Sequence, residues 1–336
     1  MNPVGVGING FGRIGRCVAK HLLKRDDVYV AGINDLADPS DLAYLLKYDS
    51  VHGWYPSKVS ATERSIDVDG RKIPFFACRE PKGISWREAG ARIVVEATGA
   101  FRRHSTAMGH IEAGAGKVII TAPSSDADGT FVLGVNSDTY DPRRHHVVSM
   151  ASCTTNSLAP VAKVLHERFG IEHLMITTVH AYTSSQSLTD TPTRKRRRGR
   201  AAALSIVPTT TGAARATALV IPELQGRMDG LALRVPVPDG SVTDIVATLK
   251  RAATPDEINE ALSRAADEPR LKGILRVSDE ALVSSDIIGD THSAIVDAES
   301  TMVLRGNVAK LLVWYDNEWG YSARVADFAA LLARQL

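Results

Sequence analysis

The sequence predicts a two-domain α/β protein, in which a doubly wound parallel sheet is followed by an α+β domain with a mostly antiparallel sheet. Three observations support this prediction. The chain has 336 residues, which is long for one hydrophobic core and suits two domains. Strand and helix patterns alternate over the first 150 residues. After residue 150, strands follow one another with few helices between them.

Composition excludes several classes of protein. Hydrophobic residues make up 44% of the chain and charged residues 23%, which excludes a disordered or collagen-like protein. The formal net charge of +2 is too small for a protein that binds polyanions over its whole surface. The chain starts directly in a strand-like pattern, and its apolar runs are much shorter than the ~20 residues of a membrane span. We therefore expect no secretory signal, no membrane partner and a cytoplasmic location.

Cysteine usage agrees with that location. Cys17, Cys78 and Cys153 are an odd number in a chain with many other core-forming residues, which indicates a reducing compartment rather than a disulfide framework. The sequence has no Cys-x-x-Cys or His-Glu-x-x-His spacing, so we predict no bound metal.

The first predicted domain comprises residues 1–152. Residues 4–9 have the pattern of a strand, residues 13–24 that of a helix and residues 28–34 that of a second strand, which together make one βαβ unit. Further elements follow in the same alternation: a strand at 93–95, a helix at 104–113 and a strand at 118–120.

The second predicted domain comprises residues 153–317. It opens with an amphipathic helix at 154–169, whose apolar face carries Leu158, Val161, Ala162, Leu165 and Phe169. Mostly strands follow, at 174–179, 231–237, 242–249 and 310–315, with one helix at 255–266. A last helix at about 318–336 has one apolar stripe, formed by Val325, Phe328, Ala329, Leu332 and Leu336. Its periodicity is compatible with either domain, and we place it with the first.

A glycine-rich turn lies where the first predicted strand meets the first predicted helix. Gly10, Gly12 and Gly15 form a G-x-G-x-x-G, which permits a tight turn and lets a pyrophosphate approach a helix N-terminus. Asp35 ends the next strand, where a carboxylate accepts both hydroxyls of an adenosine ribose. An isolated G-x-G-x-x-G turn serves only helix packing about as often as it binds a dinucleotide. Strand, helix and acid together predict a Rossmann-type domain that binds NAD.

Cys153 directly precedes the amphipathic helix, at its positive end. The helix dipole stabilises a thiolate there, which predicts a lowered cysteine pKa. His180 follows the apolar strand at 174–179, at a position free to face a cleft. Either residue alone is more often part of a core. Brought together in space, they make a nucleophile with its acid–base partner.

Five stretches closely resemble the NAD-dependent, phosphorylating glyceraldehyde-3-phosphate dehydrogenases, and they occur in order along essentially the whole chain. They are Gly7-Ile8-Asn9-Gly10-Phe11-Gly12-Arg13-Ile14-Gly15-Arg16, Leu45-Leu46-Lys47-Tyr48-Asp49-Ser50-Val51-His52-Gly53, Ala151-Ser152-Cys153-Thr154-Thr155-Asn156, Pro208-Thr209-Thr210-Thr211-Gly212-Ala213-Ala214 and Trp314-Tyr315-Asp316-Asn317-Glu318. Motifs of this length and number exclude a chance agreement.

The resemblance implies a reaction and a set of site residues. Cys153 would attack the aldehyde of glyceraldehyde 3-phosphate, and His180 would take the proton as hydride leaves for the nicotinamide. Inorganic phosphate would then cleave the thioester to 1,3-bisphosphoglycerate. The implied NAD positions are Gly10, Gly12, Arg13, Ile14, Gly15, Asp35, Arg79, Thr121 and Asn317, the last orienting the nicotinamide amide. Thr183 and Arg234 would bind the substrate phosphate, and the attacking phosphate would contact Ser152, Thr154, Arg198, Thr211 and Gly212.

A basic run, residues 194–200, has six cations in seven residues. Taken alone it is typical of a solvated loop, with nucleic-acid binding as a second interpretation. The resemblance places it in a long loop, about residues 182–204, that packs near the cofactor of a neighbouring subunit in a homotetramer.

The sequence also departs from the family's usual pattern, at Met150, Ser157, Ala181, Ser185 and Thr191. None of these departures removes a reactant, and the first four bear on the shape of the active site and on its sensitivity to thiol-directed inhibitors. Thr191 stands where leucine is frequent in NAD-specific members, and a polar side chain near arginines admits a 2′-phosphate, which Asp35 repels. We therefore predict a preference for NAD with some use of NADP.

Two other functions stay open from the sequence. Erythrose-4-phosphate dehydrogenase is a relative that uses water in place of phosphate as the second nucleophile. An RNA-binding protein on the same fold would use the basic run and would have lost catalysis. The presence of both Cys153 and His180 favours the phosphorylating enzyme.

Overall fold

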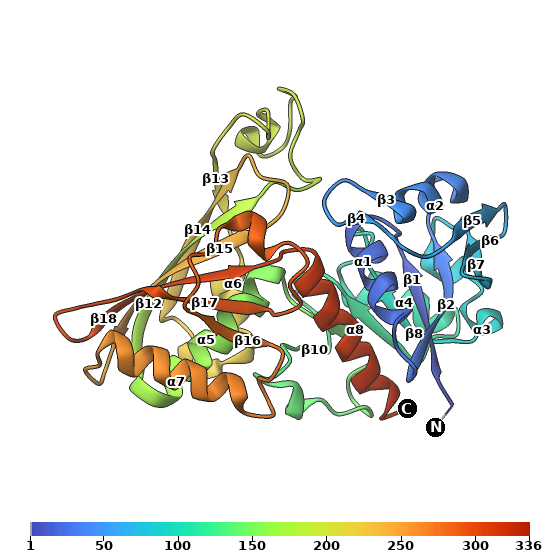
Figure 1. Ribbon diagram of the computed structural model, residues 1–336. Helices are drawn as coiled ribbons and strands as arrows, with labels where there is room; N and C mark the ends of the chain where they lie inside the picture. Colours follow the sequence, from blue (N-terminus) through green and yellow to red (C-terminus); the bar gives the residue numbers. More distant parts are fainter. Residues whose placement is uncertain (1) are drawn as a thin grey trace. The chain divides into compact units, whose positions relative to one another are not determined.

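The computed structural model describes residues 2–336, which form two compact units (Figure 1). Unit 1 contains residues 2–131, Thr139–Ala151 and Ser322–Leu336, and unit 2 contains Val132–Asp138 and Ser152–Tyr321. Unit 1 has a mostly parallel sheet and unit 2 a mostly antiparallel one. The predicted fold class is confirmed.

Unit 1 is built on a nine-stranded sheet with the strand order β10-β11-β9-β8-β1-β2-β7-β6-β5. Its centre consists of five parallel strands: β1 (Val4–Asn9), β2 (Val28–Asn34), β8 (Ala91–Glu96), β9 (Lys117–Ile120) and β11 (Val147–Ser149). These strands are nearly continuous runs of buried Val, Ile, Ala and Gly, as expected for strands covered on both faces. Because they are parallel, their carboxyl ends meet at one edge of the sheet.

The helices of unit 1 connect these strands. They are α1 (Arg13–Leu22), α2 (Pro39–Lys47), α3 (Trp86–Ala89) and α4 (His104–Glu112). Beyond β2 the sheet continues through the hairpin strands β5 (Val59–Thr62), β6 (Ser65–Val68) and β7 (Arg71–Phe76). Asp69 and Gly70 both have positive φ, of 52° and 82°, which suits the tight turn between β6 and β7. The remaining short strands are β3 (Tyr48–Asp49), β4 (Gly53–Trp54) and β10 (Gly129–Thr130).

The C-terminal helix α8 (Trp319–Ala333) packs on unit 1 from Ser322 onward. Phe328 stacks on Phe131 with ring centroids 5.6 Å apart, and Asp327 accepts a 2.8 Å hydrogen bond from Arg25. These contacts pack α8 against unit 1, whereas the helix periodicity alone is compatible with either domain. The helix ends at Ala333, so Leu336, which the sequence analysis places in the apolar stripe, lies beyond the helix.

Unit 2 is built on a seven-stranded sheet with the order β13-β14-β12-β15-β18-β17-β16. The strands are β12 (Ile171–Ala181), β13 (Val207–Thr210), β14 (Met228–Val235), β15 (Ser241–Leu249), β16 (Leu275–Ser278), β17 (Ala294–Leu304) and β18 (Val308–Tyr315). Neighbours pair antiparallel, except that β14 runs parallel to β12 and β16 runs parallel to β17.

Three helices contact the sheet of unit 2: α5 (Cys153–Phe169), α6 (Ala213–Val220) and α7 (Pro255–Asp267) (Figure 1). The apolar face of α5 lies in one core with the sheet, and Leu158 and Leu165 are fully buried there. Val132 and Val135 join this core, which explains why their short segment belongs to unit 2 rather than to the first domain that the sequence predicts.

No helix within residues 2–336 is both long enough and apolar enough to span a membrane.

Candidate active site

The glycine-rich turn after β1 has the close packing that its motif requires. Gly10 has a φ of +90°, and a side chain there would begin 2.6 Å from the backbone nitrogen of Thr98. A side chain on Gly15 would begin 2.0 Å from the carbonyl oxygen of Gly10. Gly12 differs from both, because no atom lies within 4 Å of the point where its side chain would begin. The turn is therefore tight beneath and open above Gly12, as a pyrophosphate needs.

A pocket in unit 1 opens over this turn, at the carboxyl ends of the parallel strands. Of the predicted cofactor residues, Gly10, Gly12, Asp35 and Arg79 line it. The Asp35 carboxylate accepts hydrogen bonds from the backbone N–H groups of Phe11, at 2.7 Å, and Ala37, at 3.0 Å. Further lining residues are Asn9, Asn34, Leu36, Cys78, Ala97, Thr98, Ala100 and Phe101. This set fits an adenosine and its phosphates.

The other predicted cofactor residues of unit 1 lie outside the lining of this pocket. Arg13 forms a 2.8 Å ion pair with Asp49, at the start of α1. Ile14 is in the first turn of the same helix, and Gly15 packs beneath the turn. Thr121 follows β9, and its hydroxyl and N–H both donate to the carbonyl of Glu96.

A buried polar network supports the pocket, and the sequence analysis does not identify it. Asn9 donates a 2.6 Å hydrogen bond to Glu96, and Asn34 donates a 2.7 Å hydrogen bond to Asn9. His110 Nδ1 accepts from the Trp86 indole at 2.9 Å, so its Nε2 carries the proton that faces Glu96 at 3.1 Å. The signal in the sequence was a polar residue at the end of three parallel strands, β1, β2 and β8.

Cys153 is the first residue of α5, and Ser152 caps this helix by accepting a 3.1 Å hydrogen bond from the N–H of Thr155. His180 lies near the end of β12 and is buried. Its Nε2 is 3.4 Å from Cys153 Sγ. The structure thus brings together, within unit 2, the two residues that the sequence analysis selects as reactants.

The protonation of His180 follows from its other ring nitrogen. Nδ1 lies 2.7 Å from the carbonyl oxygen of Ala181. Arg234 Nη1 also lies 3.1 Å from Nδ1, but its two N–H groups donate to the Ala181 carbonyl and the Thr183 hydroxyl. Because a carbonyl oxygen can only accept, Nδ1 carries the proton and Nε2 presents its lone pair to the sulfur. This is the tautomer that a base acting on Cys153 requires.

Burial controls the charge of this pair. It raises the pKa of Cys153 to about 11, and the Arg234 guanidinium and the Thr154 donors oppose that rise. Burial also lowers the pKa of His180 to about 3, and the charge of Arg234 acts in the same direction. The sequence predicts a lowered cysteine pKa from the helix end alone. In the structure burial outweighs the favourable charges, so thiol and imidazole are both neutral at pH 7.

Arg234 lies beside His180 because β12 and β14 are parallel with these two residues in register. Its Nη1 donates to the carbonyl of Ala181 at 3.0 Å and to the hydroxyl of Thr183 at 3.3 Å. Its Nε is buried and has no hydrogen-bond acceptor within residues 2–336. A buried guanidinium nitrogen without an acceptor indicates a place for an anion.

Arg198 extends this polar surface from the basic loop. It lies in the 3-10 turn Arg196–Gly199 and donates to Thr209, at 3.0 Å, and to Ser185, at 3.2 Å. The hydroxyls of Ser185 and Thr183 are 2.8 Å apart, so hydrogen bonds connect Arg198 to Arg234. Ser185, one of the departures from the family pattern, therefore links the two cations.

Apart from Arg198, the residues predicted for the attacking phosphate lie at two helix starts. Thr211 accepts from the N–H of Ala213 at 3.1 Å, and Gly212, which caps α6, has open space on its side-chain side. Ser152 is engaged as the cap of α5, and the Thr154 hydroxyl is bonded to the Tyr315 hydroxyl at 2.9 Å. Thr211 and Gly212 thus offer an open helix N-terminus to a phosphate.

Asn317 lies two residues after Tyr315, the last residue of β18, and is buried. Its side-chain oxygen accepts a 2.6 Å hydrogen bond from Ser241. The sequence analysis selects Asn317 but misses Ser241 and Tyr315, the two hydroxyl residues that hold this part of unit 2.

Comparisons with known proteins agree with the geometry of both units. Residues 4–104 match the glyceraldehyde 3-phosphate dehydrogenase NAD binding domain, and residues 152–317 match the glyceraldehyde 3-phosphate dehydrogenase C-terminal domain. The chain is 56% identical over 330 residues to a glyceraldehyde-3-phosphate dehydrogenase of Geobacillus stearothermophilus, covering 98% of each chain. It is 53% identical over 332 residues to one of Streptomyces coelicolor, covering 98% of this chain and 99% of the relative. It is 52% identical over 340 residues to one of Mycobacterium leprae, covering 99% of each.

Proposed function

The chain belongs to the glyceraldehyde-3-phosphate dehydrogenase family, and we propose that it converts glyceraldehyde 3-phosphate, NAD and inorganic phosphate to 1,3-bisphosphoglycerate and NADH. The resemblance that the five sequence stretches indicate is confirmed, and the chain is an NAD-dependent dehydrogenase. The observation that carries the proposed mechanism is the 3.4 Å approach of Cys153 Sγ to a correctly protonated His180.

Cys153 is the nucleophile of the proposed reaction. Its sulfur forms a bond to the aldehyde carbon, the thiol proton passes to the oxygen, and the product is a hemithioacetal. His180 Nε2 then accepts the hydroxyl proton while the carbon loses hydride and becomes a thioester. NAD held by the residues of unit 1 and by Asn317 would supply the hydride acceptor. Phosphate attacks the thioester carbon and releases the Cys153 sulfur, which takes back a proton as the acyl phosphate forms.

The substrate phosphate also explains how a histidine with a lowered pKa can act as a base. Burial is the larger cause of the lowered pKa of His180, and the charge of Arg234 adds to it, while Arg234 Nε awaits an acceptor. A phosphate bound by Arg234 and Thr183 neutralises this charge and raises the basicity of the ring. Binding energy from a group remote from the aldehyde thereby promotes the chemical step.

The second anion site is assigned to the attacking phosphate. The open N-terminus of α6 at Thr211 and Gly212 and the guanidinium of Arg198 are the donors that support it. Because Ser185 and Thr183 connect Arg198 to Arg234, the two anion sites share one hydrogen-bonded framework.

NAD would be held in unit 1 by the open glycine turn and by Asp35. A carboxylate fixed by two backbone N–H groups accepts ribose hydroxyls and repels a 2′-phosphate, which supports NAD as the preferred cofactor. Thr191 is exposed in the long loop, and we assign the minor use of NADP to this position. Asn317, in unit 2, would hold the nicotinamide amide.

We also propose that the protein is a homotetramer in the cytoplasm. Helices cover one face of the unit 2 sheet, whereas the other face carries exposed apolar side chains, with Met175 59%, Leu231 45% and Val246 38% exposed. An uncovered apolar sheet face is typical of a subunit interface. The three cysteines form no disulfide within residues 2–336, which is compatible with a reducing compartment. Light scattering should give the mass of four chains, and Met175→Lys with Leu231→Lys should lower it.

A spectrophotometric assay tests the proposed reaction. Reduction of NAD and NADP is followed with glyceraldehyde 3-phosphate or erythrose 4-phosphate, each with and without phosphate or arsenate. We expect the fastest reduction with NAD, glyceraldehyde 3-phosphate and phosphate, and a sharp loss when phosphate and arsenate are both omitted. Turnover indifferent to both anions would indicate the erythrose 4-phosphate enzyme, and NADP used as efficiently as NAD would contradict the cofactor assignment.

A further inference from the structure

Ser241, the first residue of β15, is buried and uses its hydroxyl twice. The hydroxyl donates to Asn317 Oδ1 at 2.6 Å and accepts from the backbone N–H of Ala181 at 3.1 Å. A hydroxyl has one proton and two lone pairs, so both hydrogen bonds form together without competing. One oxygen atom therefore connects β12 to the segment after β18.

The backbone of Ala181 supports the catalytic histidine through two consecutive peptide units, which meet at the Ala181 Cα. Its N–H is held by Ser241, and its carbonyl accepts from His180 Nδ1 at 2.7 Å and from Arg234 Nη1 at 3.0 Å. The tautomer and the orientation of the ring depend on this carbonyl. The hydroxyl of Ser241 anchors the peptide unit between His180 and Ala181, and the N–H of Tyr182 anchors the next unit on the carbonyl of Val237 at 3.1 Å. By restraining the Ala181 backbone, Ser241 also restrains the direction of His180 Nε2.

Asn317 is held in one of its two amide orientations. Its Oδ1 accepts from Ser241, so Nδ2 is the group left to donate to a ligand. An Asn that orients a carboxamide must present one defined atom, because the reversed amide would offer an acceptor in place of a donor. The contact with Ser241 removes that ambiguity.

We propose that Ser241 is a positioning residue, whose single hydroxyl sets both the orientation of His180 and the amide orientation of Asn317. This inference rests on the proposed function, because it assigns Ser241 a role in the same reaction. It couples the base to the group assigned to the nicotinamide, and neither the sequence motifs nor the family match names it.

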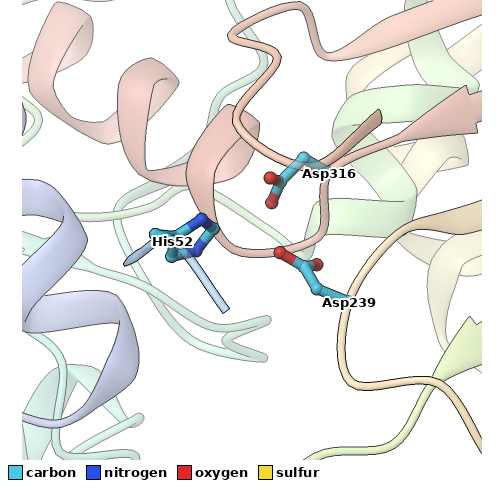
Figure 2. A group of neighbouring side chains, drawn as sticks. All are labelled: His52, Asp239 and Asp316. Carbon is cyan, nitrogen blue, oxygen red and sulfur yellow. The ribbon is translucent and has the colours of Figure 1, made fainter. Parts of the chain in front are cut away.

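The turn before Ser241 is built to hold that hydroxyl in place. Gly240 has a φ of +82°, and a side chain on it would begin 2.1 Å from the carbonyl oxygen of Ser284. Asp239 accepts from the N–H of Gly240 at 2.8 Å and is hydrogen-bonded to Asp316 (Figure 2). Asp316 precedes Asn317 in the chain. The acid pair therefore ties the turn that carries Ser241 to the segment that carries Asn317.

The test compares Ser241→Ala with a control on the same strand face. Thr243 is also fully buried in β15, and its hydroxyl has no hydrogen-bond partner within residues 2–336. Thr243→Val therefore removes a buried hydroxyl from the same strand without touching Ala181 or Asn317. We expect it to leave turnover unchanged. Ser241→Ala should lower kcat by about tenfold or more, as expected for two lost hydrogen bonds, and raise the KM for NAD.

Two readouts separate positioning from a structural role. The deuterium isotope effect on turnover, with substrate deuterated at the aldehyde carbon, should rise in Ser241→Ala because hydride transfer becomes slower. The increase in NAD KM should nearly vanish when Ser241→Ala is made in an Asn317→Ala background, because both changes remove one interaction. Ser241→Thr, which keeps the hydroxyl, should restore part of the turnover.

The outcomes distinguish this inference from the proposed function. If the unaltered protein does not oxidise the aldehyde, the proposed function fails. If it does so and Ser241→Ala keeps full kcat with an unchanged isotope effect, the inference on Ser241 is wrong. Should Ser241→Ala fold poorly, as shown by its melting temperature, Ser241→Cys keeps the side-chain size with a weaker hydrogen-bonding group and should give the same two readouts.

Discussion

His180 Nε2 faces Cys153 Sγ across 3.4 Å, while the Nδ1 proton of the same ring is donated to the Ala181 carbonyl. The first contact makes proton transfer possible, and the second fixes the tautomer that can accept a proton. Both groups are neutral in the unliganded protein, because burial raises the pKa of Cys153 to about 11 and lowers that of His180 to about 3. The geometry of the pair therefore suits proton transfer, and we propose that a substrate phosphate bound by Arg234 raises the basicity of His180.

Removal of either reactant should affect different steps. Cys153→Ser should abolish aldehyde oxidation, because a serine hydroxyl is a much weaker nucleophile than a thiol, and should leave NAD binding unchanged. His180→Asn should slow hydride transfer by ~10²–10⁴-fold, the usual share of a general base. Stopped-flow measurement of NADH formation gives the rate of oxidation in both variants. Fluorescence titration with NAD measures whether cofactor binding is unchanged in Cys153→Ser. Normal turnover in Cys153→Ser would contradict the mechanism.

Substitution of Arg234 should change both the pH dependence of thiol reactivity at Cys153 and the KM for the aldehyde. Its positive charge lowers the pKa of Cys153, so Arg234→Leu should shift the pH profile of iodoacetamide alkylation to higher pH. Arg234→Lys keeps the charge and should shift the profile less. Both variants should raise the KM for the aldehyde, because Lys lacks the Nε that awaits an anion. An alkylation profile that does not move in Arg234→Leu would exclude this electrostatic role.

Substitutions at Gly12 and Gly15 should have different effects, the first on NAD binding and the second on stability. Gly12→Ala adds a methyl group to open space, so its melting temperature should match that of the unaltered protein while NAD binding weakens at least tenfold. Gly15→Ala places its methyl 2.0 Å from the Gly10 carbonyl and should lower the melting temperature by several degrees. Calorimetry for binding and scanning calorimetry for stability measure the two effects. Equal NAD affinity in Gly12→Ala would mean that the pyrophosphate lies elsewhere.

Sequence reasoning reaches local features and stops at contacts between distant segments. The G-x-G-x-x-G turn and the cap of α5 follow from neighbouring residues, and both have the expected geometry. The network of Asn9 and His110 joins residues 101 positions apart, and the Ser241–Asn317 contact joins residues 76 apart. No periodicity reports such pairs. The prediction of a lowered pKa for Cys153 is wrong for a related reason. The helix end is visible in the sequence, whereas burial, which raises the pKa, is a property of the packed unit.

The strands that the sequence analysis misses show the same limit. β17 (Ala294–Leu304) carries Asp297, Glu299, Ser300 and Thr301 in its middle, and its pairing with β18 is interrupted between Asp297 and Met302. A bulge permits polar residues there, since the local ladder is broken. Neither apolar alternation nor a continuous apolar run marks such a strand.

The acid pair beneath Ser241 should give the protein a specific dependence of stability on pH. Burial, together with the charges of Asp316 and Glu318, raises the pKa of Asp239 from 3.8 to about 9. The folded protein therefore binds a proton that the unfolded chain releases above pH ~4, so the contribution of Asp239 to stability is greatest below that pH and is lost progressively up to about pH 9. Asp239→Asn cannot titrate and should be more stable than the unaltered protein by a margin that grows from pH 5 to pH 9.

Asp316→Asn is the matched control for that prediction. The Asp316 carboxylate accepts hydrogen bonds from the backbone N–H groups of Gly289 at 2.8 Å, Glu318 at 2.8 Å and Trp319 at 2.5 Å. It therefore acts as the ionised member of the pair. Loss of a carboxylate with three donors should lower the melting temperature at every pH between 5 and 9. Melting curves of both variants across this range decide the assignment. Parallel stability curves for Asp239→Asn and the unaltered protein would show that Asp239 does not hold the shared proton.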